Sequence, residues 1–146
     1  MTIVNRSALV PYTAAEMFSL VNDVESYPRF LPWCSSARIH QQTADEIRAS
    51  LGIAKGGFER SFTTCNRMQA DKMIEMRLLE GPFRHFEGFW RFERLDDNGS
   101  KVSLALEFEF ASRIVSMTVG PIFNHAANTL VDAFCKRAED VFGKRR

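Results

Sequence analysis

The sequence has few cysteines and no long hydrophobic run, and these shortages exclude several classes of protein. Only three cysteines occur among the 146 residues, Cys34, Cys65 and Cys135, and they are widely spaced. An odd number without a Cys-x-x-Cys pair is not typical of a disulfide framework or a zinc site. The first residues lack the apolar core of a signal peptide, and no apolar run approaches the length that crosses a bilayer. We therefore expect a protein of the reducing cytoplasm, with transient contact with the inner membrane left open.

The chain also lacks an excess of charge of either sign. Lys and Arg total 19 against 18 Asp and Glu, which gives a formal net charge of +1. This balance gives no global reason to expect a DNA partner or an anionic membrane. Phenylalanine is abundant instead, with 13 residues. A Phe-rich domain of this size is either densely packed or lines a site for a bulky apolar ligand. At this length the chain is most simply one domain, 1–146.

Two prolines bracket an unusual apolar segment near residue 30. Pro28 and Pro32 fix their own backbone angles and disfavour helical geometry in the residues before them. The pattern predicts a short turn or loop that presents Phe30, Leu31 and Trp33 in a stiff arrangement. Large apolar groups on a rigid loop are typical of the rim of an apolar cavity. The alternative is a loop that plugs its own core.

The periodicity of apolar residues predicts the secondary structure. A strand is expected at 2–10, followed by a helix that Thr13 caps with Glu16 as its capping-box partner and that ends near Asn22. Apolar and polar residues then alternate as far as Phe110, which predicts about six antiparallel strands with one buried face. The predicted turns between strands lie at 55–57, 69–71, 81–82 and 96–99.

The last third of the chain changes to helical spacing. Apolar residues from Val115 to Val141 recur at three- or four-residue steps, which indicates a long amphipathic helix. Pro121 should kink this helix or mark its true start. The predicted fold class is therefore α+β, with a curved antiparallel sheet wrapped around the C-terminal helix. Since a helix is narrower than a wide sheet, the helix, the sheet and the proline segment should enclose a pocket.

The side chains that carry chemistry give little indication of catalysis. His40, His85 and His125 have no metal-ligand spacing, and Glu107 and Glu109 share the wet face of one strand. We expect no catalytic residue, no metal site and no covalent cofactor. For an enzyme that uses polar groups inside the cavity, Arg60 and His125 are the two candidates. Parity and periodicity predict a ligand-binding set of Phe30, Leu31, Trp33, Met76, Leu78, Trp90, Leu104, Leu106, Phe108, Val119, Phe123 and Leu130.

Several segments together resemble a known family. These segments are Leu9-Val10-Pro11-Tyr12, Val21-Asn22-Asp23-Val24, Ser26-Tyr27-Pro28 with Phe30-Leu31-Pro32-Trp33-Cys34, Gly81-Pro82-Phe83, Trp90, Phe108-x-Phe110, and Ala133-Phe134 with Arg137-Ala138. They are similar to the START-like coenzyme Q-binding proteins, whose bacterial members are also called ribosome association toxins. The resemblance implies a helix-grip (START/SRPBCC-like) fold with a deep apolar cavity. It also implies a non-enzymatic protein that binds ubiquinone and supports respiratory electron transport.

Two other functions stay open at this point. The resemblance to the bacterial members implies an alternative, a toxin that binds the large ribosomal subunit and blocks subunit joining. The near-zero net charge counts against this alternative, because binding to ribosomal RNA usually leaves a basic surface. The third interpretation is an aromatase/cyclase-like enzyme, since related helix-grip folds include such enzymes. The expected partners are thus a hydrophobic small molecule or the large ribosomal subunit.

Overall fold

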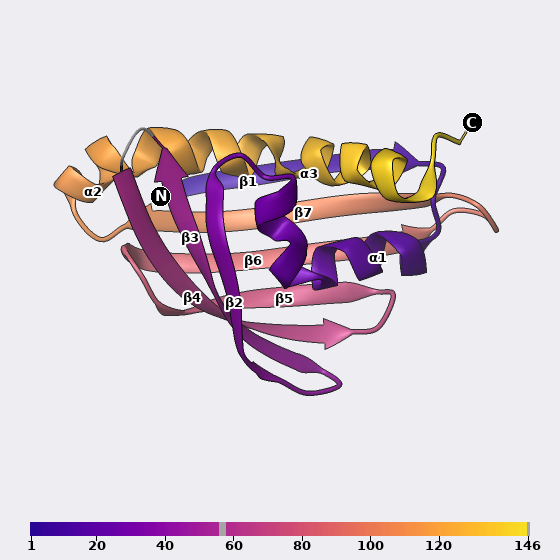
Figure 1. Cartoon of the computed structure of the whole chain (residues 1–146), viewed down its shortest axis with the longest axis horizontal. Coiled ribbons are helices and arrows are strands. Elements are labelled where there is room, and N and C mark those ends of the chain that lie inside the picture. The colour runs from indigo at the N-terminus through magenta and orange to yellow at the C-terminus, as the bar shows by residue number, and fades with distance from the viewer. Residues whose placement is uncertain (56–57, 146) are drawn as a thin grey trace.

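The computed structural model describes residues 1–55 and 58–145, in which a curved sheet is covered on one face by helices (Figure 1). The elements in chain order are β1 (Thr2–Val10), α1 (Ala14–Asn22), the 3₁₀ helix η1 (Val24–Arg29), β2 (Cys34–Gln42), β3 (Glu46–Lys55), β4 (Phe58–Gln69), β5 (Met73–Glu80), β6 (Phe83–Arg94), β7 (Ser100–Phe110), α2 (Arg113–Thr118) and α3 (Gly120–Phe142). The predicted glycine turn between β3 and β4 includes residues 56 and 57, which lie outside the described residues.

The sheet has seven antiparallel strands in the order β1-β7-β6-β5-β4-β3-β2. Strands β2 to β7 follow one another as hairpins, whereas β1 pairs with β7. The chain therefore passes from one edge of the sheet to the other through α1 and η1. In Figure 1, β5 to β7 run across the view while β2 to β4 run steeply, which shows how strongly the sheet curves. The expected curved antiparallel sheet with a long C-terminal helix is confirmed.

The first helix begins as its sequence predicts. The Thr13 hydroxyl accepts a hydrogen bond from the Glu16 backbone N–H at 3.1 Å, and the Thr13 N–H donates to the Glu16 carboxylate at 3.0 Å. This is the reciprocal capping box, which satisfies two N–H groups of the helix terminus. The proline segment that follows contains the expected turn at residues 30–33, and Pro28 lies just before it inside the short helix η1. A helix of six residues loses little at a proline, since few of its N–H groups have partners inside it.

The expected single C-terminal helix is divided into α2 and α3. Pro121 occupies the first turn of α3 and marks its start, where a missing N–H costs nothing. Val141 is 47% exposed, so the prediction that it belongs to the buried stripe is wrong. The last turn instead contacts Tyr12: the ring centroids of Tyr12 and Phe142 lie 6.0 Å apart, and the Tyr12 hydroxyl donates to the Gly143 carbonyl at 2.8 Å. This contact leaves the side chain at position 141 facing solvent.

Two groups of aromatic rings anchor α3 to the rest of the domain. Near its start, Phe123 packs against five phenylalanine rings of the sheet, at centroid distances from 4.8 to 6.2 Å: Phe62, Phe83, Phe86, Phe108 and Phe110. Three turns later, Phe134 packs against rings of η1, the segment after η1 and β6, which are Tyr27, Phe30 and Trp90, at 5.3 to 5.4 Å. The stretch of α3 between these anchors faces the sheet through smaller side chains, and the cavity described below lies there.

The C-terminal segment after α3 is attached to the start of α1. The Arg145 guanidinium forms a two-point ion pair with the Glu16 carboxylate, with N–O distances of 2.6 and 2.9 Å. The guanidinium also lies over the Tyr12 ring, 5.1 Å from its centroid. The hydrogen bond from Arg145 and the Thr13 backbone together lower the pKa of Glu16 to about 2. Glu16 thus belongs to both the helix cap and the C-terminal contact.

We expect Arg145→Met to destabilise the domain by about 1 kcal/mol near neutral pH, because it removes a charge-assisted pair at a partly exposed site. The pKa of Glu16 is lowered on folding, so the pair stabilises above the ordinary carboxyl pKa of 4.5 and is lost as the pH falls toward about 2. The difference in free energy of unfolding between wild type and variant should therefore shrink below pH 4.5, as measured by urea titration at several pH values. The same-sized change Lys144→Met is the control, and a pH-independent difference for Arg145→Met would contradict the assignment.

Candidate ligand-binding site

An apolar cavity of about 60 Å³ lies between α3 and the concave face of the sheet. Seven of the predicted ligand-binding residues line it: Trp33, Met76, Trp90, Leu104, Leu106, Phe123 and Leu130. The other lining residues come from η1, β3, β4, β6 and α3: Val24, Tyr27, Ala49, Leu51, Phe62, Thr64, Asn66, Phe86, Ala126 and Ala127. The wall is therefore built jointly by the sheet, by α3 and by the segment that contains η1.

Five of the predicted residues lie elsewhere in this structure. Phe108 is fully buried among aromatic rings, and Val119 is fully buried where α2 meets α3. Phe30 packs on Phe134 beneath the Arg137 guanidinium, and Leu78 packs near the turn at Gly81. The fifth, Leu31, lines the groove described below. Strand parity selects the face on which a side chain lies, but it does not tell whether that face meets a cavity or a packed neighbour.

Two polar residues in the cavity wall were not selected from the sequence. Thr64 and Asn66 are 8% and 9% exposed, and the Thr64 hydroxyl donates to the Asn66 side-chain oxygen at 2.9 Å. The signal was present in the strand pattern, because both residues share the parity of Phe62 and Met68 on β4. Polar side chains are mostly exposed, so two of them among the inward-facing residues of a strand indicate a polar site in the interior.

Gly88 makes room for two side chains that line this cavity, Met76 and Leu106. It lies on the buried parity of β6 between Phe86 and Trp90, opposite Met76 of β5 and Leu106 of β7. A Cβ atom at this position would lie 2.4 Å from the Met76 methyl and 3.0 Å from a Leu106 methyl. Such contacts are far inside van der Waals distance, so any side chain here would push Met76 toward the cavity.

A larger groove opens outside the cavity, between the proline segment and the exposed side of α3. Its volume is about 700 Å³, and Trp33 belongs to its wall as well as to that of the cavity. The remaining lining residues are Leu31, Pro32, Ala54, Pro121, Ile122, His125, Thr129, Asp132, Ala133 and Lys136. The Trp33 side chain thus separates the apolar cavity from the groove, whose lining contains both apolar and polar residues.

The size of the cavity limits what it holds without rearrangement. An apolar cavity of roughly 150 Å³ accommodates a benzene molecule in another protein, and the interior cavity here is less than half that size. A bulky ring therefore enters only if wall side chains move. Trp33 and Leu130 are half-buried and Trp33 also lines the groove, so these two are the side chains best placed to move.

Among the described residues, the cavity wall contains no Asp, Glu, His, Lys, Arg or Cys. The Tyr27 hydroxyl donates to the Val21 carbonyl, and burial raises the pKa of the Tyr27 phenol. Burial also raises the pKa of the nearby Cys34 thiol to about 11, so this thiol stays protonated at neutral pH. Arg60 and His125, the two candidates for polar groups in the cavity, are both exposed; His125 lines the groove, and Arg60 lines neither space.

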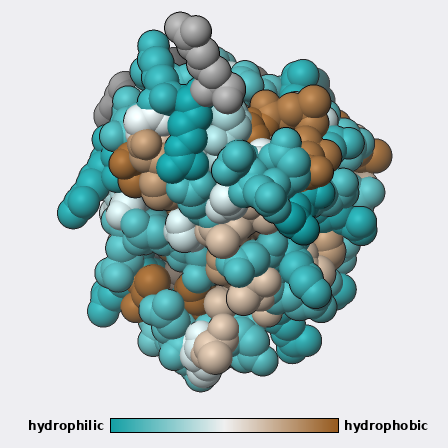
Figure 2. Space-filling model, turned by 90° about the vertical axis from the view of Figure 1, so that its right-hand side faces the viewer, coloured by the Kyte–Doolittle hydropathy of each residue, from teal (hydrophilic) through white to brown (hydrophobic). Residues whose placement is uncertain are grey.

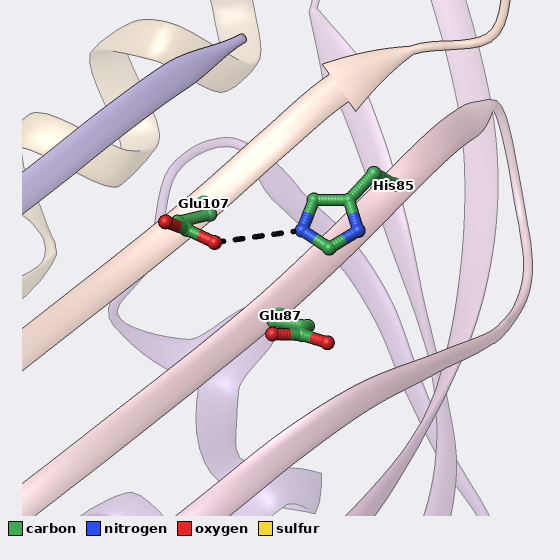
Figure 3. A group of neighbouring side chains, drawn as sticks. All are labelled: His85, Glu87 and Glu107. Carbon is green, nitrogen blue, oxygen red and sulfur yellow. Dashed lines mark ion pairs between the residues drawn. The ribbon is translucent and has the colours of Figure 1, made fainter.

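A separate polar cluster lies on the convex face of the sheet, away from the cavity (Figure 3). His85 and Glu87 come from β6 and Glu107 from β7, and one ligand atom of each lies within 4.8 Å of the others. The His85 Nε2 atom lies 3.6 Å from the Glu107 carboxylate. Glu87 faces Glu107 directly across the strands, with Arg77 on its other side. Among the described residues this is the one group with the composition of a metal site.

The exposed apolar residues on one end of the molecule lie apart from one another. Figure 2 shows the end of the molecule at the right of Figure 1 as largely hydrophilic, with hydrophobic residues in separate areas. On α2, Ile114 and Met117 are 74% and 71% exposed, one helical turn apart. Among the described residues, no helix combines the length and apolar character that crossing a bilayer requires.

Comparison with known proteins places this geometry in context. Residues 10–135 match the model of a family described as polyketide cyclase / dehydrase and lipid transport. The ribosome association toxin RatA of Pseudomonas aeruginosa is 46% identical over 97% of this chain and 99% of that protein. The mitochondrial coenzyme Q-binding protein coq10 of Schizosaccharomyces pombe is 25% identical over 91% of this chain and 84% of that protein. An aromatase/cyclase from Streptomyces sp. R1128 has a similar fold, with a TM-score of 0.81, 18% identity, and coverage of 94% of this chain and 93% of that one.

We expect protein purified without added metal to contain far less than one zinc or iron per chain. Zn²⁺ requires its ligand atoms to close to roughly 3–3.5 Å of one another, whereas the ligand atoms of this cluster lie within 4.8 Å, with 3.6 Å between the His85 Nε2 atom and the Glu107 carboxylate. Elemental analysis of freshly purified protein is the measurement. Stoichiometric zinc or iron in the wild type that is lost in Glu107→Gln would contradict this expectation and assign the metal to the cluster.

Proposed function

The chain belongs to the family of polyketide cyclases, dehydrases and lipid transport proteins, and within it to the group of the ribosome association toxins; from this premise we propose that it is a non-enzymatic protein that binds an apolar small molecule. The observation that carries the proposal is the apolar cavity that shares Trp33 with a groove more than ten times its volume. The specific ligand that we propose is a polyprenyl quinone such as ubiquinone, bound in support of respiratory electron transport.

The two spaces suit the two parts of such a ligand. The planar head would enter the cavity as Trp33 and Leu130 move aside, and the isoprenoid tail would lie along the groove beside Leu31, Pro32 and Ile122. Burial of the tail contributes about 0.8 kcal/mol per CH₂ group before entropic losses. The name of the coenzyme Q-binding relative supports this choice of ligand. Binding without chemistry is supported by the cavity wall, where the described residues include no titrating acid or base at neutral pH.

Ribosome association is the second candidate function, and the similarity of relatives favours it. The relative named for ribosome association is 46% identical to this chain, compared with 25% for the coenzyme Q-binding relative. The cations available for such a contact lie near the end of α3. Among the described residues of this region, Arg145 is bound to Glu16 and Arg137 lies over Phe30, which leaves Lys136 and Lys144 for RNA phosphates.

We expect Leu130→Trp to abolish binding of decylubiquinone while the domain still folds. The larger side chain would fill the cavity, and filling a void costs less than the roughly 1–3 kcal/mol of overpacking a dense core. Isothermal titration calorimetry measures binding, and thermal unfolding measures stability.

Asn124→Trp is the matched control, because it adds the same side chain to an exposed position of α3 outside both spaces. Equal affinity of wild type and Leu130→Trp for the quinone would remove the cavity from the proposal. A strongly destabilised Leu130→Trp would show that the site is packed core.

For the second candidate, we expect wild type to co-sediment with large ribosomal subunits in a sucrose gradient. Lys136→Glu with Lys144→Glu should weaken this association and reduce the slope of log affinity against log salt by about two, one for each phosphate contact. Lys72→Glu, in the exposed turn between β4 and β5, is the control. No co-sedimentation of the wild type at low salt would exclude this candidate, and an unchanged slope in the double variant would place the contact on another surface.

A further inference from the structure

Among the described residues of the cavity wall, Thr64 and Asn66 form a hydrogen-bonded pair of polar side chains, and the Tyr27 hydroxyl is bonded to the Val21 carbonyl. Asn66 faces Ile47 and Met76 on the neighbouring strands, and Thr64 faces Ala49 and Leu78. Leaving a buried amide without hydrogen-bond partners costs free energy, so such groups are normally satisfied by the protein or by what the protein binds. The hydrogen-bonding groups of Thr64 and Asn66 should therefore be satisfied within the protein or by a molecule bound in the cavity.

The hydrogen bond within the pair determines what it presents to the cavity. The Thr64 hydroxyl uses its single hydrogen to donate to Oδ1 of Asn66 at 2.9 Å. Among the described residues, this is the only side-chain hydrogen bond of Asn66, and its two N–H donors have no protein acceptor. The pair thus offers donors to an occupant of the cavity, with Thr64 holding the amide in orientation.

We propose that Asn66, oriented by Thr64, is the anchor that selects the ligand by donating a hydrogen bond to a neutral carbonyl or ether oxygen on its buried head. This inference rests on the proposed function and adds the chemistry that the ligand must carry. A hydrocarbon has no acceptor and leaves the amide unsatisfied. The described residues that line the cavity include no Lys, Arg or His, so a carboxylate or phosphate head would be buried without a counter-ion.

The ligand class is consequently an apolar molecule with an uncharged acceptor on a ring, as in a quinone. Free fatty acids and phospholipids are placed outside this class, because their charged heads cannot follow the apolar body into the cavity. Asn66 is a specificity-determining residue in this account and Thr64 is a positioning residue.

The test compares two ligands that differ in the acceptor. Decylubiquinone carries ring carbonyls, whereas decylbenzene has a similar tail and no oxygen. We expect Asn66→Leu to weaken decylubiquinone binding on the order of tenfold, the cost of one buried hydrogen bond, and to leave decylbenzene binding equal or tighter. Thr64→Val should weaken quinone binding by less, because the amide stays but loses its orientation. Thr63→Val, on the convex face of the same strand, is the control for Thr64→Val.

The outcomes separate this inference from the function on which it rests. If wild type binds neither probe, the proposed function fails. If wild type binds the quinone and Asn66→Leu binds it equally well, or loses both probes alike, the anchor is wrong while apolar binding stands. Should Asn66→Leu fail to fold, the infrared carbonyl band of decylubiquinone bound to wild type decides the question. A band shifted to lower frequency than in alkane supports the hydrogen bond, and an unshifted band overturns it.

Discussion

One helix has to cover the apolar face of a sheet that is much wider than the helix. Seven strands at spacings of about 4.8 Å make a sheet about 29 Å across, whereas an α-helix with its side chains is about 10 Å wide. Curvature of the sheet reduces this mismatch, and α1 and η1 cover part of what remains (Figure 1). The residual space between α3 and the sheet is the cavity. The cavity thus follows from the architecture, and its chemistry follows from the side chains that face it.

The aromatic residues decide where that space lies along α3. Phe123 and Phe134 fix the helix to the domain at two levels, each within a cluster of rings. Between them the helix presents two small residues to the cavity, Ala126 and Ala127, together with Leu130. A rigid helix held at two points cannot collapse onto the sheet between them. The sequence left open whether the many phenylalanines pack densely or line a ligand site. Both occur, since the rings pack densely around Phe123 and Phe134 and a cavity lies between these two clusters.

The sequence predicted the elements well because each has a local cause. The capping box of Thr13, the alternation within β7 and the proline at the start of α3 are all determined by neighbouring residues. The cavity wall was predicted less well, since Phe108 and Leu106 have the same parity on the same strand and only one of them meets the void. That difference depends on the position of Phe123 across the core. Thr64 and Asn66 could have been found from the sequence, because they are polar residues at positions that alternate with the outward-facing ones. Finding them requires knowing which face of β4 is buried.

Gly88 has a consequence for how such a site diversifies. The backbone ladder between β5, β6 and β7 does not involve its side chain, so the fold tolerates a change there as a local repacking of Met76 and Leu106. A methyl group at this position would collide with the Met76 methyl, so Met76 would have to move, and both Met76 and Leu106 line the cavity. A substitution here therefore reaches the cavity only through these two neighbouring side chains, while the strand pairing and the polar pair on β4 stay in place. The residue at this position shapes the ligand site without lining it.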